Sequence, residues 1–205
     1  MAPSTTLAFC LMLFCIFTYG LHFVSACTVF FRSIRDDKYN CSGDLPPVTI
    51  IRPISGLDHQ LYRTLRSTFE LEAQECEILL CAARVDDPAV AIARGLLEEY
   101  PNANARLLVG DEKISGNPKL NNCVKGWNAA SNEFIILIDS NVMLPSDYLH
   151  QMFRAWKPGC GLVSSPPVGD APENFWASVE CAFLDTHSAR LQLFAEELGI
   201  AFAPG

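Results

Sequence analysis

The sequence predicts an α/β fold in which a mostly parallel sheet carries helices on both faces, after one N-terminal transmembrane helix. Short apolar runs alternate with amphipathic stretches along residues 48–200, a pattern typical of parallel strands joined by helices. The run Phe134–Ile138 is wholly apolar and leads into Asp139, as expected for a strand buried on both faces. Residues 7–31 contain no Asp, Glu, Lys or Arg.

Residues 7–31 are expected to form the transmembrane anchor, after a short tail of residues 1–6. As a helix these 25 residues reach roughly 37 Å, enough to cross a bilayer with some tilt. Arg32, Arg35 and Lys38 follow at once, and no Lys or Arg precedes the run. The positive-inside rule therefore predicts a single pass with the N-terminus outside and the following domain in the cytosol.

Two other interpretations of this segment compete. A cleaved signal peptide would have a basic start and a shorter apolar core, and this segment has neither. Val24–Cys27 resembles a bacterial lipoprotein cleavage box, but apolar residues continue after Cys27. Asn40-Cys41-Ser42 matches a glycosylation acceptor, which is silent in the cytosol. An occupied glycan there, or a diacylated Cys27, would contradict the predicted topology.

Charge and cysteine content narrow the possible functions. The net charge of −8 argues against a nucleic-acid partner bound through a broad basic face. The nine cysteines are odd in number, and their spacing matches no paired metal motif. They are typical of reduced, cytosolic thiols and not of a disulfide framework.

The elements of the domain follow from turn, cap and periodicity signals along the chain. Polar residues 32–46 are expected to form a linker. Asp58 and Asp87 can each cap a helix, and Pro88 suits a first helical position. Strands are expected at 48–52, 77–81, 106–109, 134–138, 161–164 and 200–203, and helices at 58–69, 88–100, 119–130, 145–156 and 175–194.

Polar side chains follow three of the predicted strands. They are Asp86-Asp87, the stretch Asn117–Asn122, and Asp139-Ser140-Asn141. In an open parallel sheet the carboxyl ends of the strands form the ligand-binding crevice. An Asp there can accept a hydrogen bond from a base or ribose, a Lys can neutralise phosphate, and an Asp with a second oxygen ligand can hold Mg²⁺ or Mn²⁺ on a diphosphate. The sequence therefore predicts a nucleotide-sugar site, without a glycine-rich phosphate loop.

These residues, in this order and spacing, resemble the ceramide glucosyltransferase family of membrane-anchored, inverting GT-A glycosyltransferases. The resemblance runs from about Val48 to the C-terminus, and it implies an incomplete GT-A domain over residues 47–205. The matching pieces are Arg52–Asp58, Leu79–Cys81, Asp86–Ala89, Tyr100–Asn102, Ala105–Leu107, Gly116–Lys119 with Asn121-Asn122, Asp139-Ser140 and Gly161–Val163.

The resemblance implies roles for individual residues. Asp87 matches a family Asp near the uracil and ribose of a UDP-sugar, and Asp139 matches one that takes part in metal and diphosphate binding. Asn141 stands where related enzymes have a second acidic ligand. Lys119 and Asn122 would lie by the nucleotide. His187 aligns with a family His near donor and acceptor.

Each of these residues also has a structural interpretation. Asp87 alone is a plain helix cap, Asp139 can end a strand at a turn, Lys119 can be a solvated surface residue, and His187 on a mixed helix face can be structural.

The family's third Asp, its general base, and its Gln-x-x-Arg-Trp motif do not occur, and both are expected beyond Gly205. The chain is thus expected to be the N-terminal part of an enzyme moving glucose from a UDP-sugar to a membrane-lipid hydroxyl such as that of ceramide. Alternatives are an inactive nucleotide-binding fragment, or a transferase acting on a hopanoid or diacylglycerol. The expected location is a bacterial inner membrane, or the Golgi or endoplasmic reticulum of a eukaryote.

Overall fold

The computed structural model describes residues 3–36, 45–72 and 75–200. The chain divides into two compact units. The sheet unit lies within residues 41–159, and the helical unit combines parts of residues 1–40 and 160–205. Each unit is described separately below.

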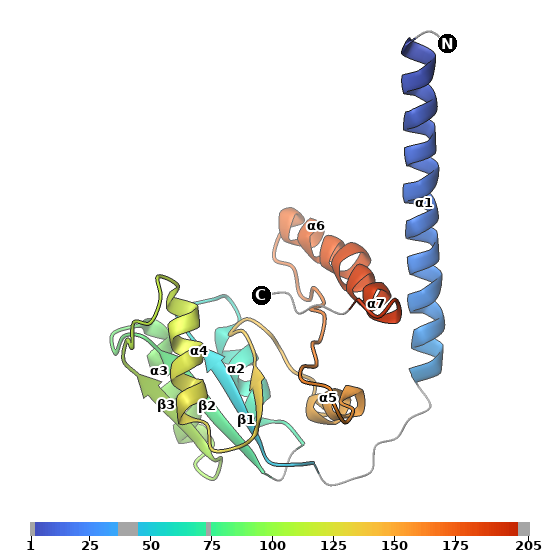
Figure 1. The fold of residues 1–205 in the computed structure, drawn as a ribbon. Helices are drawn as coiled ribbons and strands as arrows, with labels where there is room; N and C mark the ends of the chain where they lie inside the picture. Colours follow the sequence, from blue (N-terminus) through green and yellow to red (C-terminus); the bar gives the residue numbers. More distant parts are fainter. Residues whose placement is uncertain (1–2, 37–44, 73–74, 201–205) are drawn as a thin grey trace. The chain divides into compact units, whose positions relative to one another are not determined.

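The sheet unit is built on four parallel strands: β1 (Val48–Pro53), β2 (Cys76–Ala82), β3 (Ala105–Val109) and β4 (Phe134–Leu137). Their order in space is β3-β2-β1-β4 (Figure 1). Ile50 of β1 stands opposite Ile78 of β2 and Ile136 of β4. The predicted parallel sheet is therefore confirmed.

Helices cover both faces of this sheet, as expected. Helices α2 (Leu61–Phe69) and α3 (Pro88–Glu99) share one core cluster with Ile78 and Leu80. On the same face, Leu149 of α5 (Tyr148–Ala155) clusters with Val48 and Ile50. The opposite face carries α4 (Pro118–Ala129), whose last residue packs beside Ile51, Leu79 and Cys81. Alternation along β1 and β2 directs successive side chains to opposite faces.

Local sequence explains where α3 and α4 begin. The Asp87 side chain accepts a hydrogen bond from the Ala89 backbone N–H, and that of Asn117 accepts from Lys119 and Leu120. A Pro follows each cap, at a position where a missing N–H costs nothing. The predicted cap at Asp58 is wrong: α2 begins at Leu61, because the Asp58 carboxylate accepts from the neighbouring His59 N–H instead.

Two predicted strands differ from the structure. Strand β4 lies at an edge of the sheet formed by the described residues, and its side chains are partly exposed. The strands buried on both faces are β1 and, apart from Cys76, β2, and not Phe134–Ile138. Gly161–Ser164 forms no strand; it lies in irregular structure where Gln192 of a neighbouring helix donates to the Ser164 hydroxyl at 3.3 Å. The strand predicted at 200–203 falls almost wholly outside the described residues.

The helical unit contains α1 (Pro3–Asp36), α6 (Phe175–Phe183), a π-helical segment η1 (Leu184–Ser188) and α7 (Ala189–Glu197). Residues 5–32 of α1 are long and apolar enough to cross a membrane, with a mean hydropathy of 2.1. Helix α1 extends into the predicted linker. The predicted helix 175–194 is present, with its middle in η1 and its end three residues later.

Close packing between α4 and the sheet depends on Gly126. A Cβ atom at this position would lie 2.5 Å from Cγ2 of Ile51 and 3.0 Å from Sγ of Cys81. Glycine therefore lets α4 approach β1 and β2, which fixes the position of the residues at the start of α4.

We predict that Gly126→Ala destabilises the sheet unit by about 1–3 kcal/mol, the usual cost of overpacking a core. Gly95→Ala in α3 is the matched control, because a Cβ there meets no atom within 4 Å. Alanine is a better helix former than glycine, so the control should be stabilised by up to about 1 kcal/mol. Thermal unfolding in detergent, followed by tryptophan fluorescence, measures both. Equal midpoints for the two variants would contradict the packing argument.

Candidate nucleotide-sugar site

The candidate site lies at the carboxyl end of the sheet, where the strand order reverses. Starting from β1, the strands β2 and β3 follow in one direction across the sheet. Strand β4, which comes next along the chain, pairs instead with the other side of β1. Ligands of open α/β sheets bind at such a switch point. Asp139 follows β4 after one intervening residue, Ile138, and Lys119 occupies the first turn of α4.

The Lys119 and Asp139 side chains meet at this point. The distance from Lys119 Nζ to Asp139 Oδ1 is 2.7 Å, and the two side chains are 57% and 50% exposed. Exposed ion pairs contribute about 0.2–1 kcal/mol, so little energy opposes an exchange of partners. A diphosphate could then bind the ammonium of Lys119 while a metal cation binds the carboxylate of Asp139.

Asp139 and Asn141 belong to one tight turn. The Val142 backbone N–H donates to the Asp139 carbonyl at 3.2 Å, and Asn141 is exposed. One carboxylate and one amide oxygen, completed by diphosphate oxygens and water, suit Mg²⁺ or Mn²⁺, which use few protein ligands beside substrate phosphates. Among the described residues no group of three His, Cys, Asp or Glu could hold a metal alone. The donor set therefore fits a metal that arrives with a nucleotide.

The Arg52 side chain holds this turn in place. Arg52 is fully buried at the end of β1. Its Nη2 donates to the carbonyl oxygens of Asp139 and Val142, both at 2.7 Å, and of Ser140 at 3.1 Å. Nη1 donates to the Thr64 carbonyl and the Thr68 hydroxyl of α2. Burial lowers the pKa of Arg52 to about 10, an effect that the nearby Asp139 charge opposes.

Sequence reasoning missed the role of Arg52. The residue stands in a buried strand pattern, and the only sequence signal was its place in the motif Arg52–Asp58. A charged residue inside an apolar run is seldom buried without partners, and that rule could have drawn attention to it.

Asp87 connects two loops at the same end of the sheet. Its Oδ1 accepts from the backbone N–H groups of Gly56 and Ala89, both at 2.9 Å, and its Oδ2 accepts from the Ser55 hydroxyl at 3.1 Å. Gly56 has φ +67°, a conformation that glycine adopts without strain. The carboxylate thus joins the end of β1 to the start of α3, and the predicted helix cap is confirmed.

Asn122 is buried and faces Lys125 of the same helix. The Lys125 ammonium donates to the Ala82 and Gly110 carbonyls, each at 2.6 Å, and to Asn122 Oδ1 at 3.1 Å. Burial lowers the pKa of Lys125 below its ordinary value. Lys125 therefore connects the ends of β2 and β3 to α4. The side-chain oxygen of Asn122 accepts a hydrogen bond from the same ammonium group and helps to hold it in place. The position of Asn122 beside a bound nucleotide remains a prediction.

His187 belongs to the helical unit. It lies in η1, where its ring stacks on Phe183 at a centroid distance of 4.9 Å and lies 5.9 Å from the ring of His22 in α1. Single π-helical turns occur often at functional sites. The predicted role of His187 near donor and acceptor remains a prediction.

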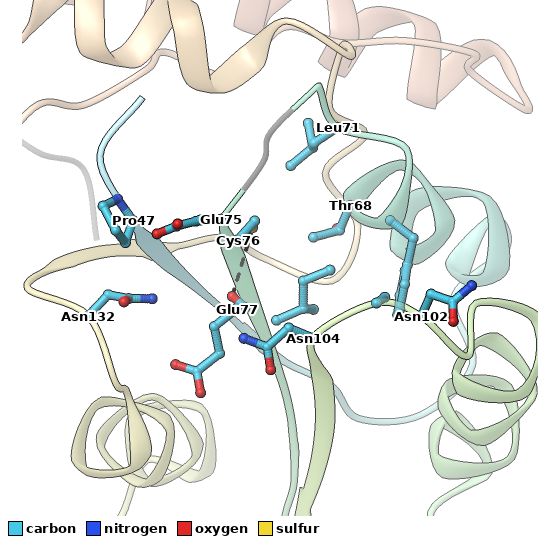
Figure 2. Close-up of a pocket in the computed structure, with 12 residues that line it drawn as sticks. Pro47, Thr68, Leu71, Glu75, Cys76, Glu77, Asn102, Asn104 and Asn132 are labelled. Carbon is cyan, nitrogen blue, oxygen red and sulfur yellow. Dashed lines mark hydrogen bonds between the residues drawn. The ribbon is translucent and has the colours of Figure 1, made fainter. Parts of the chain in front are cut away.

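A pocket of about 460 Å³ lies at the opposite, amino end of the sheet. Figure 2 shows Glu77, Asn104 and Asn132 around it. Burial alone would raise the pKa of Glu77, but hydrogen bonds lower it: first that from the Ser131 backbone N–H, then those from side chains that include Thr49 and Arg106. The side chains of Glu77 and Asn132 already have protein partners, and the pocket is at the wrong end of a parallel sheet for substrate.

The fold matches that of a solved glycosyltransferase. A mannosyltransferase from Pyrobaculum calidifontis, solved with GDP-mannose and Mn²⁺, superimposes with a TM-score of 0.50 at 20% identity, over 78% of this chain and 48% of that one. The sheet unit, with its polar carboxyl edge, has the GT-A type of fold of nucleotide-diphospho-sugar transferases.

Sequence comparison then gives the family. The family model of glycosyl transferase family 21 matches residues 5–205, and the chain belongs to this family. Ceramide glucosyltransferase 1 of Caenorhabditis elegans is 30% identical over 93% of this chain and 42% of its own length. The ceramide glucosyltransferase of Komagataella phaffii is 36% identical over 53% of this chain and 22% of its own. The resemblance noted in the sequence is confirmed, and the chain spans less than half the length of these relatives.

We predict that Arg52→Met destabilises the chain by about 3 kcal/mol or more, because it leaves several buried carbonyl groups without donors. Arg52→Lys keeps the charge but cannot reach both the turn and α2, so it should be intermediate. Arg63→Met is the matched control on exposed α2 surface and should stay within about 0.5 kcal/mol of the parent. Thermal unfolding in detergent ranks the three. A ranking in which Arg63→Met costs as much as Arg52→Met would refute this role.

Proposed function

We propose that the sheet unit binds a UDP-sugar, and that the whole protein transfers glucose from it to the hydroxyl of a membrane lipid such as ceramide. The Lys119–Asp139 pair at the switch point carries this proposal. It offers one cation for phosphate and one carboxylate for a metal, on a turn whose backbone Arg52 fixes. Membership of glycosyl transferase family 21 supports the reaction class.

In this proposal each residue has one task. Asp139, with Asn141 beside it, holds Mg²⁺ or Mn²⁺, and the bound metal offsets the charge of the leaving diphosphate. Lys119 binds a phosphate oxygen. Asp87 lies at the mouth of the same sheet edge and contacts the uracil or ribose. Arg52 is a positioning residue that keeps the Asp139 turn in the conformation that binding needs.

Transfer would follow a single displacement with inversion. The lipid hydroxyl attacks the anomeric carbon from the face opposite the diphosphate, so a bond to the acceptor oxygen forms as the bond to the diphosphate oxygen breaks. We assign removal of the hydroxyl proton to a carboxylate in the part of the relatives that this chain does not span.

The membrane helix supports a lipid acceptor. With α1 crossing the bilayer and Arg32 at its cytosolic end, the site would face cytosolic UDP-sugar and the acceptor would come from the same membrane. The identity of the lipid rests on the ceramide glucosyltransferase relatives.

We expect Asp139→Ala to abolish the Mn²⁺-dependent part of UDP binding, since the variant removes the charged metal ligand. Lys119→Met should weaken UDP binding roughly 10-fold or more, the effect of one lost charge-assisted hydrogen bond. Glu133→Gln, an exposed residue at the other end of β4, is the matched control and should bind as the parent does. Calorimetric titration of the detergent-solubilised chain with UDP, with and without Mn²⁺, provides the measurement. Mn²⁺-dependent binding that survives Asp139→Ala would disprove the metal assignment.

Substitutions at Asp87 separate its two proposed tasks. Asn is as good a helix cap as Asp, so Asp87→Asn should retain stability but bind UDP roughly 10-fold more weakly, because a charged acceptor is lost. Asp87→Ala should lose both affinity and about 1 kcal/mol of stability. Thermal unfolding and UDP titration on the same samples distinguish the two effects. If Asp87→Asn binds UDP like the parent, Asp87 is a structural cap alone.

A further inference from the structure

Helix α6 presents an aromatic face that the described chain leaves uncovered. Phe175, Trp176, Val179 and Phe183 are 71%, 77%, 47% and 56% exposed. Their spacing of one, three and four residues places them on one side of an α-helix. Four large apolar side chains in a row on one helix face indicate a binding surface.

The opposite side of α6 is already occupied by the loop that precedes it. The Gly169 backbone N–H donates to Asp185 Oδ1 at 2.7 Å. A Cβ atom at Gly169 would lie 2.5 Å from Cα of Cys181, so this loop lies directly against the helix. The aromatic face is therefore the side of α6 that remains for a partner.

Helix α6 continues through η1 into α7, and α7 packs on the second half of α1 (Figure 1). Arg32 of α1 pairs with Glu196 at 2.6 Å, and Nη2 of Arg190 lies 2.6 Å from Nδ1 of His22. Ser25, between His22 and Arg32, is fully buried. This polar stripe of α1 faces protein and not lipid.

The remaining part of α1 suits the bilayer. Residues 5–21 carry no charge and expose large apolar side chains such as Phe14 and Phe17 all along the helix. Further along, Phe23 and Phe31 remain exposed as well, and only the stripe with Ser25 turns toward protein. About 17 residues are the least that spans a hydrocarbon core. With residues 5–21 placed in the hydrocarbon core, the contacts between α1 and α7 begin where the core ends, at His22. This placement brings α6 to the level of the lipid headgroups.

We propose that α6 is an interfacial helix whose aromatic face inserts into the membrane that α1 crosses. Trp and Phe favour this depth, because an aromatic ring gains burial there while the indole N–H stays near water. The charged residues of α6 and η1 are Glu180 and Asp185, both acidic. The partner is therefore a zwitterionic or neutral lipid surface, bound by insertion without attraction to anionic headgroups. The inference rests on α1 crossing the bilayer, and it is independent of the nucleotide site.

Quenching of tryptophan fluorescence by brominated phosphatidylcholine tests this directly. Trp127→Phe with Trp156→Phe leaves Trp176 as the single reporter in the full chain, reconstituted in phosphatidylcholine vesicles. We expect a blue-shifted emission and loss of intensity with lipid brominated near the headgroup, less loss with lipid brominated near the chain ends, and little quenching by aqueous acrylamide. Added anionic lipid should leave the signal unchanged.

A matched variant moves the reporter to the flank of α6. Adding Trp176→Phe and Ser178→Trp places the ring away from the aromatic face, and its quenching by brominated lipid should be clearly weaker. Equal quenching at both positions would overturn the assignment of the face. Trp176 quenched by acrylamide and not by lipid would show a water-exposed helix. Trp176 protected from both would show a protein occupant, either a second copy or a further part of a longer chain. Either result would overturn the proposal.

Discussion

The buried guanidinium of Arg52 is the interaction on which the candidate site depends. It sits at the end of the central strand and binds three carbonyl oxygens of the turn after β4, as well as two groups of α2. One side chain thereby fixes the turn carrying Asp139 relative to β1 and to α2, a helix on the face that also carries α3 and α5. Because the backbone is held from within, the proposed exchange of partners at Lys119 and Asp139 would need only rotation of their side chains. Binding then needs little ordering of the chain.

Much of the sheet unit could be predicted from the sequence because its signals are local. Alternating apolar runs gave the parallel strands, and the Asp87-Pro88 pair marked the start of α3. Asp139 and Lys119 were both placed at the carboxyl edge, and the structure brings them within hydrogen-bond distance. This agreement follows from topology, since all parallel strands end on one side. Their roles toward a ligand remain predictions.

Other features of the fold and the site depend on contacts between segments that are distant in the sequence. The periodicity of apolar residues carries no information about such contacts. Whether an apolar strand lies at the centre or the edge of a sheet depends on strand order, so β1 and β2, and not β4, are the strands buried on both faces. Arg52 and Lys125 bind carbonyl groups, and any residue supplies a carbonyl, so no pattern of side chains marks these partners. Gly161–Ser164 has the composition of a strand but no neighbouring strand to pair with in the described chain.

The buried cations Arg52 and Lys125 change the electrostatic charge that an arriving anion meets at the carboxyl edge of the sheet. All of their described hydrogen-bond acceptors are uncharged carbonyl, amide or hydroxyl oxygens. Carboxylates act on both cations only through space, without a hydrogen bond: Asp139 on Arg52, and Asp111 and Glu112 on Lys125. Charges inside the protein are screened by salt far less than surface ones. The two buried cations therefore offset part of the negative charge that Asp139, Asp111 and Glu112 place at this edge, and they do so even at physiological ionic strength. This offset lowers the repulsion that an arriving anion would meet.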